Sequence, residues 1–283
     1  MSRQWTGFTT ALRFTLTAHV RNRLALVLAV TFIPLWVHLV RVCAYDAVLH
    51  FQVHAAGGEI AASNNRATQV NSALNAVTVI VGFMMFMEAF QSGPLDRRLV
   101  LAGYPRRHLM AGKVVALVAI AAVLAVYTAL LLRLSFPLEQ FWQLALAVFT
   151  ANLAYGGIGV MLGPLLRGEL EGFFLIIMTS LVDAALQNPG MNPLADQPGL
   201  RFLPMYAPSQ LAYTSAFTPV WAGSYAAGGL VWFALCTTAG LLFFSLRTRS
   251  YRRPGARGRG FALPGQRRAG RTTEERARPG AEV

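Results

Sequence analysis

Long stretches without charge are the feature that most restricts what this chain can fold into. A helix needs about 20 consecutive, mainly apolar residues to cross the hydrocarbon core of a bilayer, and runs close to that length recur along the chain. A membrane β-barrel would instead alternate polar and apolar residues along each strand. We therefore predict an all-α membrane protein with six transmembrane helices, at residues 24–42, 70–90, 106–133, 140–163, 170–187 and 220–246.

The composition favours the same class. Of the 283 residues, 55% are hydrophobic and only 13% are charged, whereas a soluble domain carries about 25% charged residues. The two cysteines, Cys43 and Cys236, lie in or beside apolar runs and predict neither a disulfide framework nor a metal site. The histidines lack the spacing of metal ligands, so we predict no metal; they include His38, His50, His54 and His108.

Residues 3–20 are predicted to form a helix that lies in the membrane interface. Their apolar side chains recur every three or four residues and so share one helical stripe, formed by Trp5, Phe8, Leu12, Leu16 and Val20. Arg3 and Arg13 lie off this stripe, and the segment is too polar to cross a bilayer. The alternative is a leader, which would place its apolar core here and a small-residue cleavage site after it. We find neither pattern.

The net charge of +13 depends strongly on the end of the chain, because 11 of the 25 basic residues follow Leu246. Residues 248–283 are rich in Arg, Gly and Pro, which predicts a disordered tail. Such a tail would contact anionic membrane lipid with about 1 kcal/mol per basic residue near the surface. Nucleic-acid binding is not predicted, since no aromatic-basic motif accompanies the charge.

The arginines also predict an orientation. Under the six-helix arrangement, 21 of the basic residues lie on the side that holds both termini and 4 lie on the other side. Basic residues in short loops accumulate on the cytoplasmic side of membrane proteins. We therefore expect a multi-pass protein of the cell membrane with both termini in the cytoplasm.

Residues 92–113, "SGPLDRRLVLAGYPRRHLMAGK", then lie in the cytoplasm between the second and third predicted spans. Ser92 suits a helix cap and Pro94 a first helical position, which predicts a short helix that ends at Gly103 and lies roughly parallel to the membrane. We expect its leucines to share one face and its charged residues to point into the cytosol. The residues concerned are Leu95 and Leu99, and Asp96, Arg97 and Arg98. The alternative is a solvated loop without a partner.

This stretch resembles the cytoplasmic loop of type-2 ABC exporter permeases, in which leucines, a small residue, proline, basic residues and Gly-Lys form a coupling helix. The matching residues here are Gly103, Pro105, Arg106, Arg107, Gly112 and Lys113. The distance from Glu88 to Pro105 is longer than usual in that family. Residues 188–217 are similar to the family's external re-entrant segment, with a pattern formed by Pro193, Pro198, Leu203, Pro204, Pro208, Tyr213 and Phe217. The resemblance covers residues 1 to about 247.

The resemblance implies a permease that works with a second copy or a homologous permease and with cytoplasmic ATP-binding cassette subunits. Its substrate would be an amphipathic or hydrophobic compound, such as a drug, a natural product or a peptide. The residues implied in coupling to the ATPase are Leu95, Asp96, Arg97, Arg98, Leu99, Tyr104, Pro105, Arg106 and Arg107. The partner uses the ATP: this chain has no phosphate loop, since Arg107 stands where "MAGK" would need a glycine and Val114 replaces Ser/Thr. We expect no cofactor and no enzyme activity.

A few residues inside the predicted spans are candidates for the translocation path. Acids are costly in a membrane, which favours a function for Glu88 and Asp183. We expect Glu88 to pair with Arg97 or Arg98 at the inner interface, and Asp183 either to line the exit or to end a helix in water. Met84 and Met87 form a soft apolar patch that suits a hydrophobic substrate, or simply fill the core or face lipid. The glycines from Gly156 to Gly163 predict close helix packing, within the chain or against a second permease.

Two other classes remain as alternatives. A polytopic membrane enzyme would use Glu88 or Asp183, and its acids or histidines would converge at one depth, whereas here they are scattered. A secondary transporter usually shows internal inverted repeats, and we find none.

Overall fold

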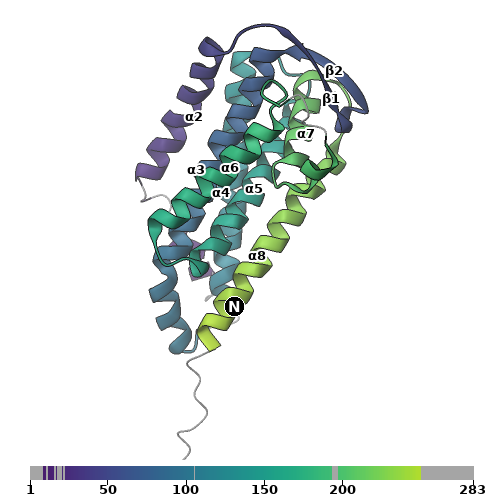
Figure 1. The fold of residues 1–283 in the computed structure, drawn as a ribbon. Helices are drawn as coiled ribbons and strands as arrows, with labels where there is room; N and C mark the ends of the chain where they lie inside the picture. Colours follow the sequence, from purple (N-terminus) through teal and green to yellow (C-terminus); the bar gives the residue numbers. More distant parts are fainter. Residues whose placement is uncertain are drawn as a thin grey trace, which may run out of the picture. The chain divides into compact units, whose positions relative to one another are not determined.

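The computed structural model describes residues 9, 10, 12–15, 17, 21, 23–104, 106–192 and 197–249, which are mainly helical (Figure 1). The long helices are α2 (Arg23–Cys43), α3 (Asn64–Leu101), α4 (Arg106–Ser135), α5 (Phe141–Leu165), α6 (Glu169–Gln187) and α8 (Ala226–Arg249). The short elements are β1 (Val48–Val53), η1 (His54–Ala56), β2 (Gly58–Ser63), η2 (Pro198–Phe202), α7 (Tyr206–Phe217) and η3 (Gly223–Tyr225). The tail beyond Arg249 lies outside the described residues. So does much of the predicted interfacial helix, of which the described residues are helical.

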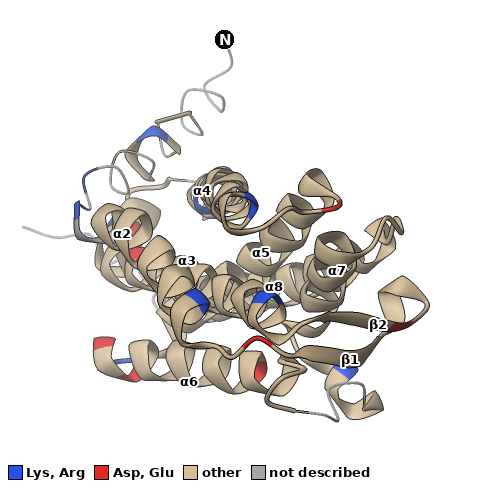
Figure 2. Cartoon of the chain, turned by 90° about the horizontal axis from the view of Figure 1, so that it is seen from above, with Lys and Arg blue, Asp and Glu red and all other residues tan. Residues whose placement is uncertain are grey.

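Five helical segments of the described chain are long and apolar enough to cross a membrane, which confirms the prediction of membrane-length helices. They lie at Leu26–Cys43, Asn64–Leu101, His108–Ser135, Phe141–Leu165 and Gly223–Leu246. Most of the ribbon in Figure 2 is accordingly free of charged residues. Helix α6, the predicted fifth span, is 19 residues long, carries Glu169 and Glu171 in its first turn, and is not among the five. The count of six spans is therefore not confirmed.

Helix α3 corrects the prediction of a separate short helix after residue 92. It runs without a break from Asn64 to Leu101, through Pro94, for 38 residues. At 1.5 Å per residue its length is about 57 Å, nearly twice the roughly 30 Å of a bilayer core. The leucines and arginines that follow Pro94 are good helix formers, which favours continuation of the helix beyond the proline. The predicted end is correct: the helix stops at Leu101, and Gly103 has a φ of +90°.

A β-hairpin between α2 and α3 is an addition to the predicted all-α fold. β1 and β2 pair antiparallel, from Val48 opposite Ser63 to Val53 opposite Gly58. Their turn is closed by η1 and by Gly57, whose φ of +81° a residue with a side chain rarely adopts. Alternate side chains of β1 face inward, and the ring of Phe51 packs edge-on against Tyr213 of α7. The hairpin precedes α3, so it lies at the opposite end of that helix from Leu101 (Figure 1).

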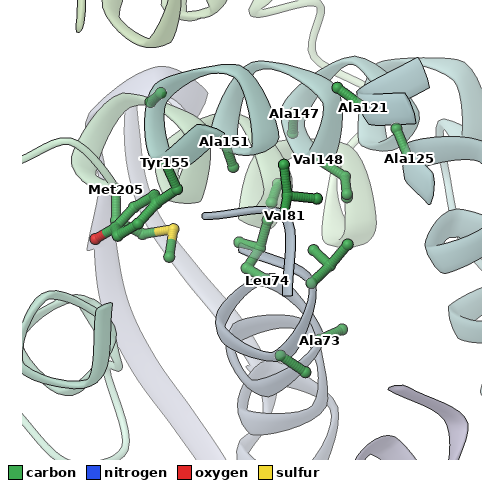
Figure 3. Close-up of a cluster of buried hydrophobic side chains, with 14 of the residues drawn as sticks. Ala73, Leu74, Val81, Ala121, Ala125, Ala147, Val148, Ala151, Tyr155 and Met205 are labelled. Carbon is green, nitrogen blue, oxygen red and sulfur yellow. The ribbon is translucent and has the colours of Figure 1, made fainter. Parts of the chain in front are cut away.

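The core is centred on the contact between α3 and α5. Figure 3 shows buried side chains gathered between these two helices, with Met205 beside the ring of Tyr155. Glycine allows the close approach: a Cβ added to Gly159 would lie 2.3 Å from the carbonyl oxygen of Gly82. A Cβ added to Gly163 would lie 2.4 Å from the Cβ of Ala89. The glycine pair predicted to permit close packing is therefore used within the chain.

Replacing Gly159 with alanine should lower the free energy of unfolding by about 1–3 kcal/mol, because the added methyl group meets backbone that has no room to move. Thermal unfolding in detergent micelles would measure the change. Gly93→Ala is the matched control in α3, since nothing lies within 4 Å of an added Cβ there. The gain in helix propensity is opposed there by Pro94, which disfavours helical backbone at a preceding residue that carries a Cβ, so the stability should change by less than about 1 kcal/mol. Equal stability of the Gly159→Ala and unaltered chains would contradict the close α3–α5 contact.

Candidate functional site

The end of α3 and the beginning of α4 are joined by three polar side chains, which we call the clasp: Ser92, Asp96 and Lys113. The Lys113 ammonium nitrogen lies 2.6 Å from Asp96 Oδ2 and also donates a hydrogen bond to the Ser92 hydroxyl. That hydroxyl donates in turn to Asp96 Oδ2 over 3.2 Å. Asp96 and Lys113 are each only 4% exposed. The clasp is thus a closed triangle of charge-assisted hydrogen bonds.

The clasp corrects the predicted facing of one residue of this segment. Asp96, expected to point into the cytosol, is buried, whereas Leu95 and Arg98 are exposed. The expected packing of Leu95 against a partner subunit stays a prediction. Because α3 is continuous, the rotational phase of residues 92–101 is set by the packing of the whole helix. A buried carboxylate is stable there because Lys113 of α4 lies opposite it.

A stripe of exposed residues follows on the other face of the last turns of α3. Leu95, Arg98 and Leu101 are spaced three apart and all exposed, Leu101 at 68%. Side chains at this spacing are neighbours on a helix surface. We call these three residues the outer stripe. It combines two large apolar groups with a cation.

The structure describes some of the other residues predicted for coupling. Leu99 and Tyr104 are half-buried, and the Tyr104 ring packs edge-on against His108 at 6.4 Å between centroids. Pro105 lies outside the described residues, as do the side chains of Arg97, Arg106 and Arg107. The coupling roles of all nine residues remain predictions.

Three of the predicted path residues lie on α3. Glu88 is half-buried, and its expected pairing with Arg97 or Arg98 remains a prediction. Met84 belongs to the buried core, and Met87 packs against that core from a half-buried position. Of the uses open to the two methionines, core packing is therefore the one that the described contacts support.

Asp183 is buried, at 1% exposed, which excludes its alternative role as a water-exposed helix end. Its Oδ2 accepts hydrogen bonds from the Tyr155 hydroxyl at 2.7 Å and from the backbone N–H of Met205 at 2.8 Å. Asp183 therefore ties α6 both to α5 and to the segment that leads into α7.

Asp183 is part of a polar seam along the contact of α3 and α6. Asn75 Nδ2 donates to the Ser180 carbonyl at 3.1 Å and to its hydroxyl at 3.0 Å, and the Thr78 and Ser180 hydroxyls lie 3.2 Å apart. Asn71 Nδ2 donates to the Ala184 carbonyl at 3.0 Å. We did not single out these α3 and α6 partners from the sequence, although the spacing of Asn71, Asn75 and Thr78 places them on one helical face.

The seam combines satisfied and unsatisfied polar groups. Tyr213 of α7 donates to the Gln187 carbonyl at 3.2 Å. Burial raises the pKa of the Tyr213 hydroxyl, so the phenol stays protonated and remains a donor. Asp183 Oδ1, Asn71 Oδ1 and Gln187 Nε2 have no hydrogen-bond partner within 3.5 Å among the described residues, although the side chains of Asp183 and Gln187 interact with each other. A seam with spare donors and acceptors is less tightly specified than apolar packing, and it has groups available for a rearranged set of bonds.

The described part of the chain contains no group of three or more His, Cys, Asp or Glu residues arranged to hold a metal ion. No protein-family model matches the chain, and no curated protein matches it significantly.

Removing the Tyr155 hydroxyl tests the hydrogen bond to Asp183. Tyr155→Phe should lower the free energy of unfolding by about 1–3 kcal/mol, since a buried carboxylate oxygen loses one of its two donors. Tyr45→Phe is the control, because Tyr45 is exposed in the connection to the hairpin. Thermal unfolding of both variants in detergent would compare them. Equal stability of the two would contradict a structural role for the Tyr155–Asp183 contact.

Proposed function

We propose that this chain is the membrane permease subunit of an ATP-driven type-2 ABC exporter. It would carry an amphipathic or hydrophobic compound, such as a drug, a natural product or a peptide, across the cell membrane. The observation that carries the proposal is the turn between α3 and α4. There Leu95, Arg98 and Leu101 form an exposed surface at the end of one of two membrane-length helices, in a segment whose sequence is rich in arginine.

The length of α3 supports a segment that projects out of the membrane. We call this segment, the last turns of α3 and the turn to α4, the foot. A helix of about 57 Å extends roughly 27 Å beyond a hydrocarbon core of about 30 Å, even when it stands upright. The apolar stretch of α3 lies in its middle, and the residues from 91 to 107 contain one acid and four arginines. In this proposal the end that carries the outer stripe is the cytoplasmic one, in agreement with the distribution of arginines.

The outer stripe suits a protein partner. Exposed leucines beside an arginine favour a groove with apolar walls and acidic residues, because apolar burial supplies affinity and complementary charge fixes the orientation. The partner in this proposal is a cytoplasmic ATP-binding cassette subunit, which hydrolyses ATP and moves the foot. The chain itself binds no nucleotide.

Movement of the foot would reach the membrane through α3. A helix transmits displacement along its length as long as it does not bend, and α3 contacts the glycines of α5 and forms the polar seam with α6. In this proposal α6 is the fifth of six spans, both termini are cytoplasmic, and a second copy or a homologous permease completes the path. The half-satisfied seam is where the helices would shift against each other.

The direct test is purification of the tagged chain from its native membrane in mild detergent. We expect an ATPase with a phosphate loop to copurify, and the pair, reconstituted in vesicles, to move an amphipathic dye such as ethidium only with ATP. Purification without an ATPase, together with dye movement independent of ATP, would reject the proposal in favour of a secondary transporter or an enzyme.

A charge placed in the outer stripe tests the docking surface. Leu101→Asp should weaken binding of the ATPase subunit by about tenfold or more, because a carboxylate replaces an apolar contact at the interface. The permease should unfold at an unchanged temperature, since Leu101 is exposed.

Phe202→Asp is the matched control. Phe202 is exposed in η2, beside Arg201, which contacts His54 next to the hairpin, so the new charge stands at the other end of the molecule. Binding of the ATPase, measured by surface plasmon resonance, should be unaffected. Equal loss of binding in both variants would argue against docking through the stripe.

A further inference from the structure

Pro94 interrupts the hydrogen-bond ladder of α3 just before the outer stripe. Proline has no N–H, so residue 94 cannot donate to the carbonyl of Phe90, and its ring crowds the preceding turn. Sharp bends in helices occur mostly at such positions. The last two turns of α3, which carry Leu95, Arg98 and Leu101, are therefore attached to the rest of the helix through a weak point.

The clasp spans this weak point. Ser92 precedes Pro94 and Asp96 follows it, and both are held by the single ammonium group of Lys113 from α4. The three contacts close a triangle, because the Ser92 hydroxyl also donates to Asp96. A bend at Pro94 that separates the turns on its two sides would break at least one of these bonds.

We propose that Lys113 and Asp96 are positioning residues that splint α3 across Pro94, which means that they hold the turns on the two sides of the proline in a fixed relative position. A displacement of the outer stripe is then transmitted to the rest of α3 and to α4 and is not lost as bending. This inference rests on the proposed function for its coupling role. The clasp would not touch the substrate or the nucleotide, and it would act through the stiffness of the foot.

Stability alone is a poor explanation of the clasp. Buried ion pairs are frequently no more stabilising than well-packed apolar side chains of similar size, because both ions lose their hydration. Their directional bonds do fix the relative position of two elements. The clasp is buried, and its residues on α3 lie on both sides of a proline. Both features agree with a role in fixing the position of α3 relative to α4.

The first test needs no partner. In the purified chain, Lys113→Met should increase backbone hydrogen exchange at residues 95–102 by at least about tenfold, because local opening at Pro94 becomes easier. Adding Pro94→Ala to this variant should return exchange to the level of the unaltered chain, since alanine restores the missing hydrogen bond. Lys113→Arg, which keeps the charge, should stay near the unaltered level.

The second test uses the complex of the chain with its ATPase in vesicles, with ethidium as the probe. Lys113→Met should reduce the number of dye molecules moved per ATP hydrolysed by at least about fivefold, the low end of typical coupling between sites. Binding of the ATPase should be retained, because the outer stripe is intact. The Pro94→Ala and Lys113→Met double variant should recover the ratio, which a loss of folding or packing would not allow.

The outcomes separate the two proposals. Failure of the unaltered complex to move dye with ATP rejects the proposed function, while the hydrogen-exchange experiment still decides whether the clasp splints α3. Unchanged exchange in Lys113→Met overturns the splint. Faster exchange with an unchanged ratio of dye to ATP overturns its role in coupling, as does a double variant that remains uncoupled. The apolar pair Asp96→Leu with Lys113→Met is the folding control, and its unfolding temperature should match that of the unaltered chain.

Discussion

Helix α3 lies against α5 at a distance that only glycine permits. The carbonyl of Gly82 occupies the place that a side chain at position 159 would take, and Ala89 does the same opposite Gly163. Lipid chains are as apolar as the side chains of a core, so helices in a membrane associate through such close packing and through polar contacts more than through the hydrophobic effect. The positions of the seam, the clasp and the outer stripe all follow from where this contact places α3.

Polar groups are distributed along α3 in two zones with different chemistry. Asn71, Asn75 and Thr78 share hydrogen bonds with α6 in the half that follows the hairpin, where several donors and acceptors are left over within the described residues. Near the other end, Asp96 forms an ion pair with a second helix. Neutral amides and hydroxyls exchange partners at small cost, whereas a buried ion pair resists separation. The same helix is thus adaptable in one zone and fixed in the other.

In the proposed function, the two faces of the last turns of α3 would have different roles. One face is satisfied internally by Lys113, and the other presents leucines and an arginine outward. A docking surface transmits force only when the segment beneath it is rigid, and Pro94 makes that rigidity depend on tertiary contacts. Among the described residues, the hairpin and α7 lie at the opposite end of α3. They cover the beginning of α3, where Phe51 meets Tyr213.

The sequence alone determined the helical class, the approximate positions of five membrane-length helices, the end of α3 at Gly103 and the basic character of the turn that follows. These properties depend on local composition, length and glycine. The tertiary structure decided the continuation of α3 through Pro94, the burial of Asp96, the partners of Asp183 and the formation of the β1–β2 hairpin. Each of these depends on a residue distant in the chain, such as Lys113 or Tyr155, and periodicity within one segment carries no information about the partner that another segment supplies.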